Sequence, residues 1–259
     1  MTVVDDRIEA SPVTGAPALT LARVQKRFGA GVLALDGVSL EVEPGSFTCL
    51  VGASGCGKTT LLRLLAGLER PSAGRVEVAG RTALLFQEAA LFPWLTAARN
   101  VELPLRLAKV RRAERERRAA ELLELVHLGG FAGRRPHELS GGMRQRVALA
   151  RALAQDAEVL LMDEPFGALD AITRDLLHDE LERLWATTGL TVVFVTHNVR
   201  EAVRLGDRVV LLSSRPGRVA ASFDVDIPRP RRMETAEVAG AAAEITARLR
   251  QEVRRHGRS

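Results

Sequence analysis

Residues 52–59 read Gly-Ala-Ser-Gly-Cys-Gly-Lys-Thr, and this stretch decides the fold of the 259-residue chain. An apolar run, Phe47–Val51, precedes it, and a helical pattern, Thr59–Leu68, follows it. The eight residues fit G-x-x-x-x-G-K-[ST] in the strand-to-helix context that this motif requires. Glycines let the backbone turn tightly and aim its N–H groups inward, and the next helix adds its positive N-terminal end. We therefore predict a loop that binds nucleoside triphosphate; a glycine-rich turn without ligand is the alternative.

Two side chains of this loop have specific expected roles. Lys58 should reach the β- and γ-phosphates, and the hydroxyl of Thr59 should hold Mg²⁺. The loop alone does not distinguish a kinase from a GTPase or a motor, so other positions must narrow the class.

Acidic residues end a second apolar run. Val159–Met162 leads directly into Asp163 and Glu164, and a buried parallel strand ends where its ligands bind. Asp163 should hold Mg²⁺ through water, and Glu164 should act as general base on the attacking water. His197 follows the apolar run Thr191–Thr196 in the same way and is expected to bond the γ-phosphate. Solvated acids and a structural histidine are the alternatives.

Short apolar strands alternate with helices along the chain. The expected strands are Leu19–Val24, Val32–Val42 (broken at Asp36-Gly37), Phe47–Val51, Arg75–Val78, Ala83–Phe86, Val159–Met162, Thr191–Thr196 and Arg208–Leu212. The expected helical segments are Thr59–Leu68, Ala97–Ala154, Asp170–Thr187 and Val199–Leu205. This alternation predicts an α/β fold whose mostly parallel sheet is covered on both faces, with an inserted helical subdomain at about residues 89–157.

Residues 139–146 read Leu-Ser-Gly-Gly-Met-Arg-Gln-Arg. Ser140 can cap a helix beginning at Gly141, and the glycines leave its N–H groups uncovered, which creates a second anion site. Here the chain resembles the ABC ATPase superfamily, whose signature is LSGGQ; Met143 departs from it at the fifth position. An ordinary capped helix is the alternative. In the family this site closes over ATP that the phosphate loop of the other protomer holds.

The resemblance covers about Leu19 to Leu212 and implies further roles. Phe28 would stack on adenine, Gln87 would touch Mg²⁺ or water and sense the γ-phosphate, and Asp170 would lie in the loop that crosses the dimer interface. The residues that the resemblance implies around ATP are Phe28, Gly52, Ala53, Ser54, Gly55, Cys56, Gly57, Lys58, Thr59, Thr60, Ser140, Gly141, Gly142 and Asp170. The implied catalytic residues are Glu164, His197 and Gln87, and the implied metal ligands are Thr59, Gln87 and Asp163.

The family implies a P-loop NTPase core with an N-terminal antiparallel β portion. We expect a flexible leader at residues 1–18, the ATPase domain at 19–225, and a basic, partly helical extension at 226–259. Phe92-Pro93-Trp94, the nearby Asn100-Val101, and Asp224–Arg232 are similar to the nitrate/sulfonate/taurine importer branch. The implied protein is an ATPase that, as a homodimer, energises import of a small solute through a separate membrane permease.

The importer resemblance also implies partners and location. Phe92, Pro93 and Trp94 would form the socket for a permease helix, although Phe92 and Trp94 could instead pack the helical subdomain. An extracytoplasmic solute-binding protein would act indirectly, and the chain would lie at the cytoplasmic face of the membrane as a peripheral subunit. The rival function is a non-transport ABC ATPase that acts on nucleic acid or ribosomes; no nucleic acid is expected for the importer.

Composition narrows these possibilities. The net charge of +5 permits nucleic acid, anionic lipid or polyphosphate as partners. We expect the basic runs Arg111–Arg118 and Arg229–Arg232, and the tail Met233–Ser259, to be solvated. No stretch approaches the roughly 18 apolar residues of a membrane helix. The two cysteines lack zinc-ligand spacing; Cys56 could be a reactive thiol, but a small spacer is preferred.

Overall fold

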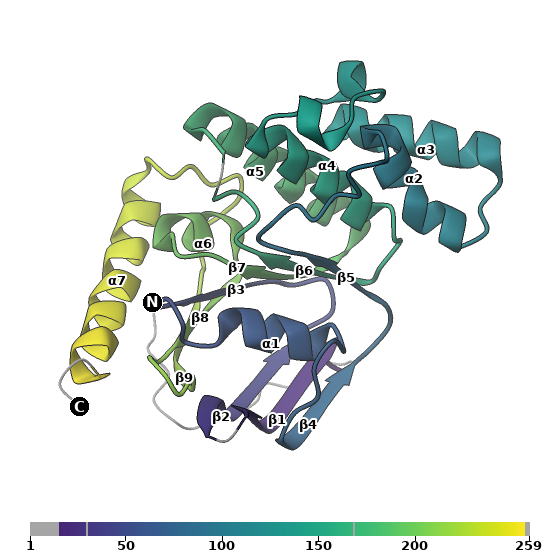
Figure 1. The fold of residues 1–259 in the computed structure, drawn as a ribbon. Helices are drawn as coiled ribbons and strands as arrows, with labels where there is room; N and C mark the ends of the chain where they lie inside the picture. The colour runs from purple at the N-terminus through teal and green to yellow at the C-terminus, as the bar shows by residue number, and fades with distance from the viewer. Residues whose placement is uncertain (1–15, 30, 168, 257–259) are drawn as a thin grey trace.

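The computed structural model describes residues 16–256, apart from residues 30 and 168. Most of the predicted leader, residues 1–15, therefore lies outside the described residues. Figure 1 shows a central sheet with helices on both sides, a smaller sheet beneath one side, and a long C-terminal helix along one flank.

The central sheet has six strands in the order β5-β6-β7-β3-β8-β9. Their bounds are β5 Thr82–Leu85, β6 Val159–Asp163, β7 Thr191–Val195, β3 Phe47–Gly52, β8 Arg208–Leu212 and β9 Val219–Asp224. All neighbours pair in parallel except β8 and β9. Strands β3, β6 and β7 are buried along their whole length, as expected when both faces of a parallel sheet are covered. Their carboxyl ends therefore meet at one edge.

A separate antiparallel sheet has the order β2-β1-β4, with β1 Leu19–Phe28, β2 Val32–Val42 and β4 Ala73–Val78. The predicted break in β2 at Asp36-Gly37 is wrong. The strand continues because Gly37 adopts a φ of 66° and the register with β1 shifts at this point, as in a β-bulge. Strand β9 was not predicted, because its Ala-Ala-Ser centre gives no apolar pattern.

Helix α1 (Lys58–Leu65) covers one side of the central sheet, and the other helices lie on the opposite side or flank (Figure 1). The predicted helical stretch Ala97–Ala154 consists of α2 Ala97–Leu107, α3 Arg112–Leu125 and α4 Gly141–Leu153, with 3-10 turns at Gly129–Phe131 and Pro136–Glu138. Helices α5 Ala171–Thr188, α6 Val199–Leu205 and α7 Ala236–His256 complete the fold. In the part of the chain with described placement, no helix has the length and apolarity needed to cross a bilayer.

The basic segment after β9 is not solvated throughout, so this expectation was wrong for Arg229 and Arg231. Arg231 is only 4% exposed, and its guanidinium donates to the carbonyls of Ile227, Val203, Gly206 and Val225. Two of these carbonyls belong to the end of α6, where helical carbonyls have no partner within the helix. Arg229 lies over the Trp185 ring, 4.3 Å from its centroid. Within this basic run, Arg231 therefore satisfies the free carbonyls at the C-terminal end of α6.

The expectation of a solvated tail was wrong for one face of α7. Val238, Ala242 and Ile245 are buried, and their spacing of four and three residues places them on one side of the helix. They join the core cluster beside α6. In the other basic run, Arg112 and Arg117 make ion pairs with glutamates of their own helix and remain exposed, as predicted. Arg115 and Arg118 are only 17% and 25% exposed, so the expectation of a solvated run was wrong for these two residues.

Candidate functional site

The phosphate loop, residues 52–59, joins the carboxyl end of β3 to α1. Gly57 has a φ of 100°, and a Cβ there would lie 2.6 Å from Leu35 Cδ2. At Gly52 a Cβ would lie 2.8 Å from Cys56 Sγ and 2.9 Å from the Leu212 carbonyl oxygen. These positions accept only glycine because of both conformation and space. The backbone of the loop therefore packs closely against Leu35 and Leu212.

Lys58 lies at the centre of this loop. Its side chain is buried, and the ammonium donates to the carbonyls of Gly52 at 2.8 Å and Ala53 at 3.1 Å. The ammonium group of Lys58 therefore lies at the N-terminal end of α1, beside the first N–H groups of the helix. This combination of positive charge and N–H donors suits a polyphosphate. Thr59 and Thr60 follow within the first turn of the helix.

Cys56 is a buried residue of the loop itself. It is 1% exposed, and burial raises the pKa of its thiol, although the nearby Lys58 partly opposes the rise. A protonated, inaccessible thiol is a poor nucleophile. The geometry supports the small-spacer interpretation over the reactive one.

Asp163 and Glu164 lie at the same sheet edge, at the end of β6. Burial raises the pKa of Asp163 and the charge of Glu164 adds to this, whereas a hydrogen bond with Thr59 and the charge of Lys58 act in the opposite direction. The carboxylate thus lies beside the Thr59 hydroxyl of the phosphate loop. Glu164 has a φ of 47°, which is unfavourable for a residue with a Cβ and typical of functional sites.

The side chain of Glu164 lies beside His197. Its Oε2 is 3.2 Å from His197 Nδ1, and its backbone N–H donates to the Val195 carbonyl at 3.0 Å. Glu164, Phe166, Gly167, Arg174, Thr196, His197, Asn198 and Glu201 line a small pocket here. The predicted base and the predicted γ-phosphate contact are therefore neighbours on adjacent strands.

Replacing the buried carboxylate is expected to stabilise the fold while abolishing activity. Because the folded chain holds a proton on Asp163 more tightly than the unfolded chain, ionisation above the ordinary pKa of 3.8 lowers stability. In Mg²⁺- and nucleotide-free buffer at pH 7, Asp163→Asn should therefore raise the melting temperature. The gain should shrink as pH falls through the raised pKa. Calorimetric melting at several pH values measures it, and a lower melting temperature at pH 7 would contradict it.

The signature forms the start of α4. Ser140 caps the helix by accepting from the Met143 N–H at 3.2 Å. Gly141 is exposed, and a Cβ there would have no heavy atom nearer than 3.9 Å. Met143 is partly buried and packs against the core. The predicted capped helix end is therefore present and accessible.

The structure does not bring the signature to the phosphate loop of the same chain. Figure 1 shows α4 and α1 on opposite sides of the central sheet. Among residues 16–256 without 30 and 168, no hydrogen bond or ion pair joins the two motifs. Ser140, Gly141 and Gly142 can therefore contact a nucleotide on this loop only from another chain or after a large rearrangement.

The segment containing Gln87 follows β5 and is exposed. Helix α4 holds it on both sides of Gln87: Gln145 Nε2 donates to the Phe86 carbonyl at 3.1 Å, and Arg151 donates to the carbonyls of Ala89 and Ala90. Helix α4, which begins at the signature, is thus hydrogen-bonded to the segment that contains Gln87. This link was not predicted, although Gln145 and Arg151 lie on the helix that starts at the signature.

Phe28 and Asp170 lie at element ends. Phe28 ends β1 and is 38% exposed, with the Lys26 ammonium 4.9 Å from its ring centroid. Such a ring is available for stacking. Asp170 caps α5 by accepting from the Thr173 N–H at 2.9 Å. In the part of the chain that the structure describes, neither side chain forms a hydrogen bond or ion pair with the phosphate loop.

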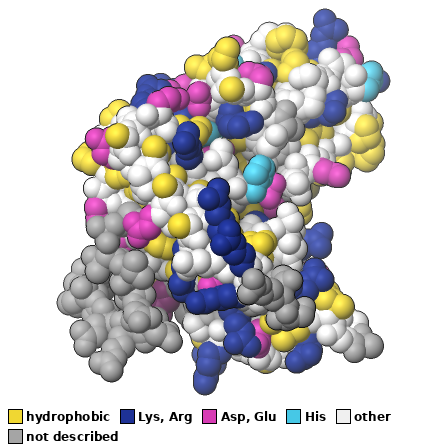
Figure 2. Space-filling model, turned by 90° about the vertical axis from the view of Figure 1, so that its left-hand side faces the viewer, with side chains coloured by type: hydrophobic (Ala, Val, Ile, Leu, Met, Phe, Trp, Pro, Cys, Tyr) yellow, Lys and Arg dark blue, Asp and Glu magenta, His cyan; other side chains and the backbone are white. Residues whose placement is uncertain are grey.

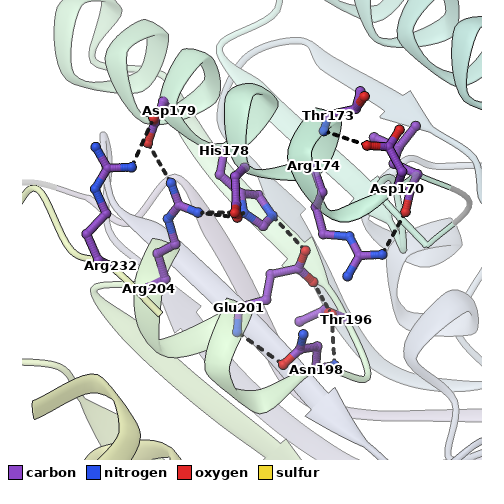
Figure 3. Close-up of polar contacts among 12 residues, drawn as sticks. Asp170, Thr173, Arg174, His178, Asp179, Thr196, Asn198, Glu201, Arg204 and Arg232 are labelled. Carbon is purple, nitrogen blue, oxygen red and sulfur yellow. Dashed lines mark hydrogen bonds and ion pairs between the residues drawn. The ribbon is translucent and has the colours of Figure 1, made fainter. Parts of the chain in front are cut away.

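A buried polar network beneath His197 was missed by sequence reasoning. Figure 3 shows Thr196, Glu201, His178 and Arg204 joined by hydrogen bonds between α5, α6 and the end of β7. His178 and Glu201 lie 23 residues apart on two helices, so no local pattern connects them.

Comparisons with known proteins agree with this geometry. A family model described as ABC transporter matches residues 35–167. The taurine import ATP-binding protein TauB of Rhizobium johnstonii is 47% identical over 237 residues, covering 88% of this chain and 90% of that protein. The aliphatic sulfonates import ATP-binding protein SsuB 1 of Mesorhizobium japonicum is 45% identical over 246 residues, covering 93% and 91%.

The fold is also similar to that of solved ATP-binding cassettes. A dimeric, post-hydrolysis structure of the cassette MJ0796 bound to ADP and Pi has a TM-score of 0.75 and 34% identity, covering 81% of this chain and all of that chain. The predicted fold class and the resemblance to the taurine and sulfonate branch are confirmed. By its sequence, its fold and its relatives, the chain belongs to the ABC transporter family, as an ATP-binding subunit that hydrolyses ATP.

Proposed function

We propose that this chain energises the import of a small solute of the nitrate, sulfonate or taurine type through a separate membrane permease. The observation that carries the proposal is the convergence of Lys58, Thr59, Asp163, Glu164 and His197 at one sheet edge, in a chain whose similar relatives are named for taurine and sulfonate import. The chain would act at the cytoplasmic face of the membrane as a peripheral subunit.

The residues at this edge have distinct roles in the proposal. Lys58 and the start of α1 bind the phosphates, and Glu164 takes the proton of the attacking water while His197 holds Glu164 and the γ-phosphate in place. Thr59 and Asp163 are hydrogen-bonded to each other and offer hard oxygen ligands that fit Mg²⁺. The family resemblance adds the side-chain oxygen of Gln87 to this ligand set. When bound, that ion would neutralise charge on the phosphates.

Two copies complete each site. The exposed, capped start of α4 lies away from the phosphate loop of its own chain, and a second copy can present it to the nucleotide. The dimeric MJ0796 cassette, which has the same fold, is consistent with such an arrangement. In this proposal Phe28 stacks on adenine and Asp170 lies in the loop that crosses between the copies.

The turn at Phe92-Pro93-Trp94 is the proposed permease socket. Asn100 is fully buried and builds this turn: its Oδ1 accepts from the Phe92 N–H, and its Nδ2 donates to the carbonyls of Phe92, Leu95 and Thr96. Trp94 is nevertheless 67% exposed, with its ring 5.4 Å from that of Phe92. A rigid turn that exposes a large aromatic side chain is suited to anchoring a partner.

Removing this aromatic side chain should weaken assembly without affecting nucleotide binding. For Trp94→Ala, we expect affinity for the permease to fall by about 30-fold or more, the effect of losing an aromatic anchor worth about 2 kcal/mol. Leu68→Ala, which removes a 59% exposed side chain after α1, is the control. Co-purification with the permease and nucleotide titration measure the two properties. Unchanged assembly would assign Trp94 to subdomain packing.

The rival function, an ABC ATPase acting on nucleic acid or ribosomes, has less support. On the face drawn in Figure 2, Lys and Arg side chains form a narrow line bordered by acidic, apolar and histidine side chains rather than a broad basic surface. The test is reconstitution in liposomes with the permease encoded by a neighbouring gene. ATP hydrolysis stimulated by solute-loaded binding protein would support import, whereas stimulation by DNA or ribosomes alone would support the rival.

A further inference from the structure

His178 and Glu201 form a buried pair between α5 and α6. His178 is fully buried, Glu201 is 5% exposed, and His178 Nε2 lies 2.7 Å from Glu201 Oε1. No role at the nucleotide site was expected for either residue. Buried polar groups of this kind are costly unless all their hydrogen bonds are satisfied, so the surrounding bonds decide what the pair does.

Arg204 fixes the tautomer of His178. Its guanidinium donates to His178 Nδ1 at 3.0 Å and to Asp175 Oδ1 at 3.0 Å. Because a guanidinium can only donate, Nδ1 must accept, and the ring proton lies on Nε2. His178 therefore donates to Glu201. Arg204 also bonds Asp179, which in turn pairs with Arg232, so the imidazole is anchored at its far side (Figure 3).

The other oxygen of Glu201 holds the turn that carries His197. Glu201 Oε2 accepts from the Thr196 hydroxyl, which accepts from the Asn198 N–H at 3.0 Å. Asn198 Oδ1 then accepts from the N–H groups of Arg200 and Glu201. Both neighbours of His197 are thus fixed, while the His197 side chain itself is 68% exposed and bonded to Glu164.

The same imidazole supports the segment that follows Glu164. The Phe166 ring packs edge-on against His178, with centroids 5.1 Å apart. Phe166 is buried and also contacts Phe194 on β7. His178 therefore supports both segments. It packs directly against Phe166 in the segment Glu164–Phe166, and it is linked to the segment Thr196–Asn198 through its hydrogen bond with Glu201.

We propose that His178 and Glu201 are positioning residues for hydrolysis. They support the two segments that carry Glu164 and His197, and so they keep these two side chains at the right distance from each other. This inference rests on the role proposed above for His197. A carboxylate at 201 accepts two hydrogen bonds, from Thr196 and His178, whereas an amide can accept only one and presents a donor to the other. The pair has no contact with the phosphate loop, so it should act on the chemical step rather than on ATP binding.

The test compares steady-state ATP hydrolysis by full-length variants. Glu201→Gln should lower kcat by about tenfold or more, with KM for ATP changed by less than about twofold, because small misplacements of catalytic groups reduce turnover strongly. His178→Phe keeps a ring beside Phe166 but loses both hydrogen bonds, and it should fall similarly. His178→Gln can accept from Arg204 and donate to Glu201, so it should recover most of the activity.

Glu182→Gln is the matched control. Glu182 is also buried, lies on α5 and pairs with Arg229, away from the His197 turn. Its loss should lower the melting temperature while leaving kcat unchanged. If Glu201→Gln does not fold, the comparison of His178→Phe with His178→Gln carries the same test.

A double variant separates this inference from the proposed function. If Glu201 acts through His197, then His197→Ala combined with Glu201→Gln should be no slower than His197→Ala alone. Wild-type kcat in both Glu201→Gln and His178→Phe, or a further full loss in the double variant, would overturn the inference. Wild-type turnover by His197→Ala itself would instead overturn the proposed role of His197.

Discussion

Glu164→Gln is expected to bind ATP normally and to lose turnover by about 10²–10⁴-fold. Glu164 Oε2 lies 3.2 Å from His197 Nδ1, and Glu164 directly follows the carboxylate that bonds Thr59, so we assign it as the base that activates the attacking water. General-base catalysis accounts for rate effects of this size. Because the variant cannot remove the γ-phosphate, the ATP-bound dimer should accumulate.

The matched control is Glu158→Gln, at the opposite end of strand β6, where the side chain pairs with Arg81. It removes a carboxylate adjoining the same strand but far from the phosphate loop, and it should leave turnover unchanged. Phosphate release and equilibrium ATP binding give the two measurements. Full turnover by Glu164→Gln would refute its assignment as base.

Gly141→Asp should abolish hydrolysis although the chain folds normally. In the isolated chain a Cβ at this position meets nothing closer than 3.9 Å, and an acidic side chain favours a helix N-terminus. The substitution places bulk and negative charge where a partner's γ-phosphate is expected. We predict a loss of turnover of about 100-fold or more, comparable to losing a key anion-stabilising donor, with ATP affinity for the phosphate loop retained.

Gly240→Asp is the control for the second prediction. Gly240 lies in α7, and a Cβ there also meets no heavy atom within 4 Å. Both variants should melt near the wild-type temperature, so that a difference in turnover reports on position 141 alone. Normal hydrolysis by Gly141→Asp would mean that the start of α4 does not contact nucleotide.

The sequence identified those parts of the site whose chemistry lies at strand ends. Phosphate loop, acidic pair and His197 each follow an apolar run, and parallel strands bring their carboxyl ends together, so Glu164 and His197 could be expected to meet. The fold class followed from the same alternation of strands and helices. These predictions needed only local patterns and one rule of sheet geometry.

Other features depended on contacts that no local pattern encodes. The burial of Arg231 depends on unpaired carbonyls at the end of α6, and a short basic run looks the same whether solvated or buried. His178 and Glu201 were missed because polar residues on helices are normally exposed, and the two lie on different helices, α5 and α6. Strand β9 forms through pairing with β8 rather than through its own weak pattern.

The measurement that tests the composite site most directly is the mass of the protein in solution with MgATP, for Glu164→Gln and for Glu164→Gln combined with Gly141→Asp. We predict that the first variant changes from monomer to dimer on adding ATP, and that the second binds ATP equally well yet remains monomeric. If the doubly substituted protein formed the same ATP-dependent dimer, the nucleotide would not be held between the phosphate loop of one copy and α4 of the other.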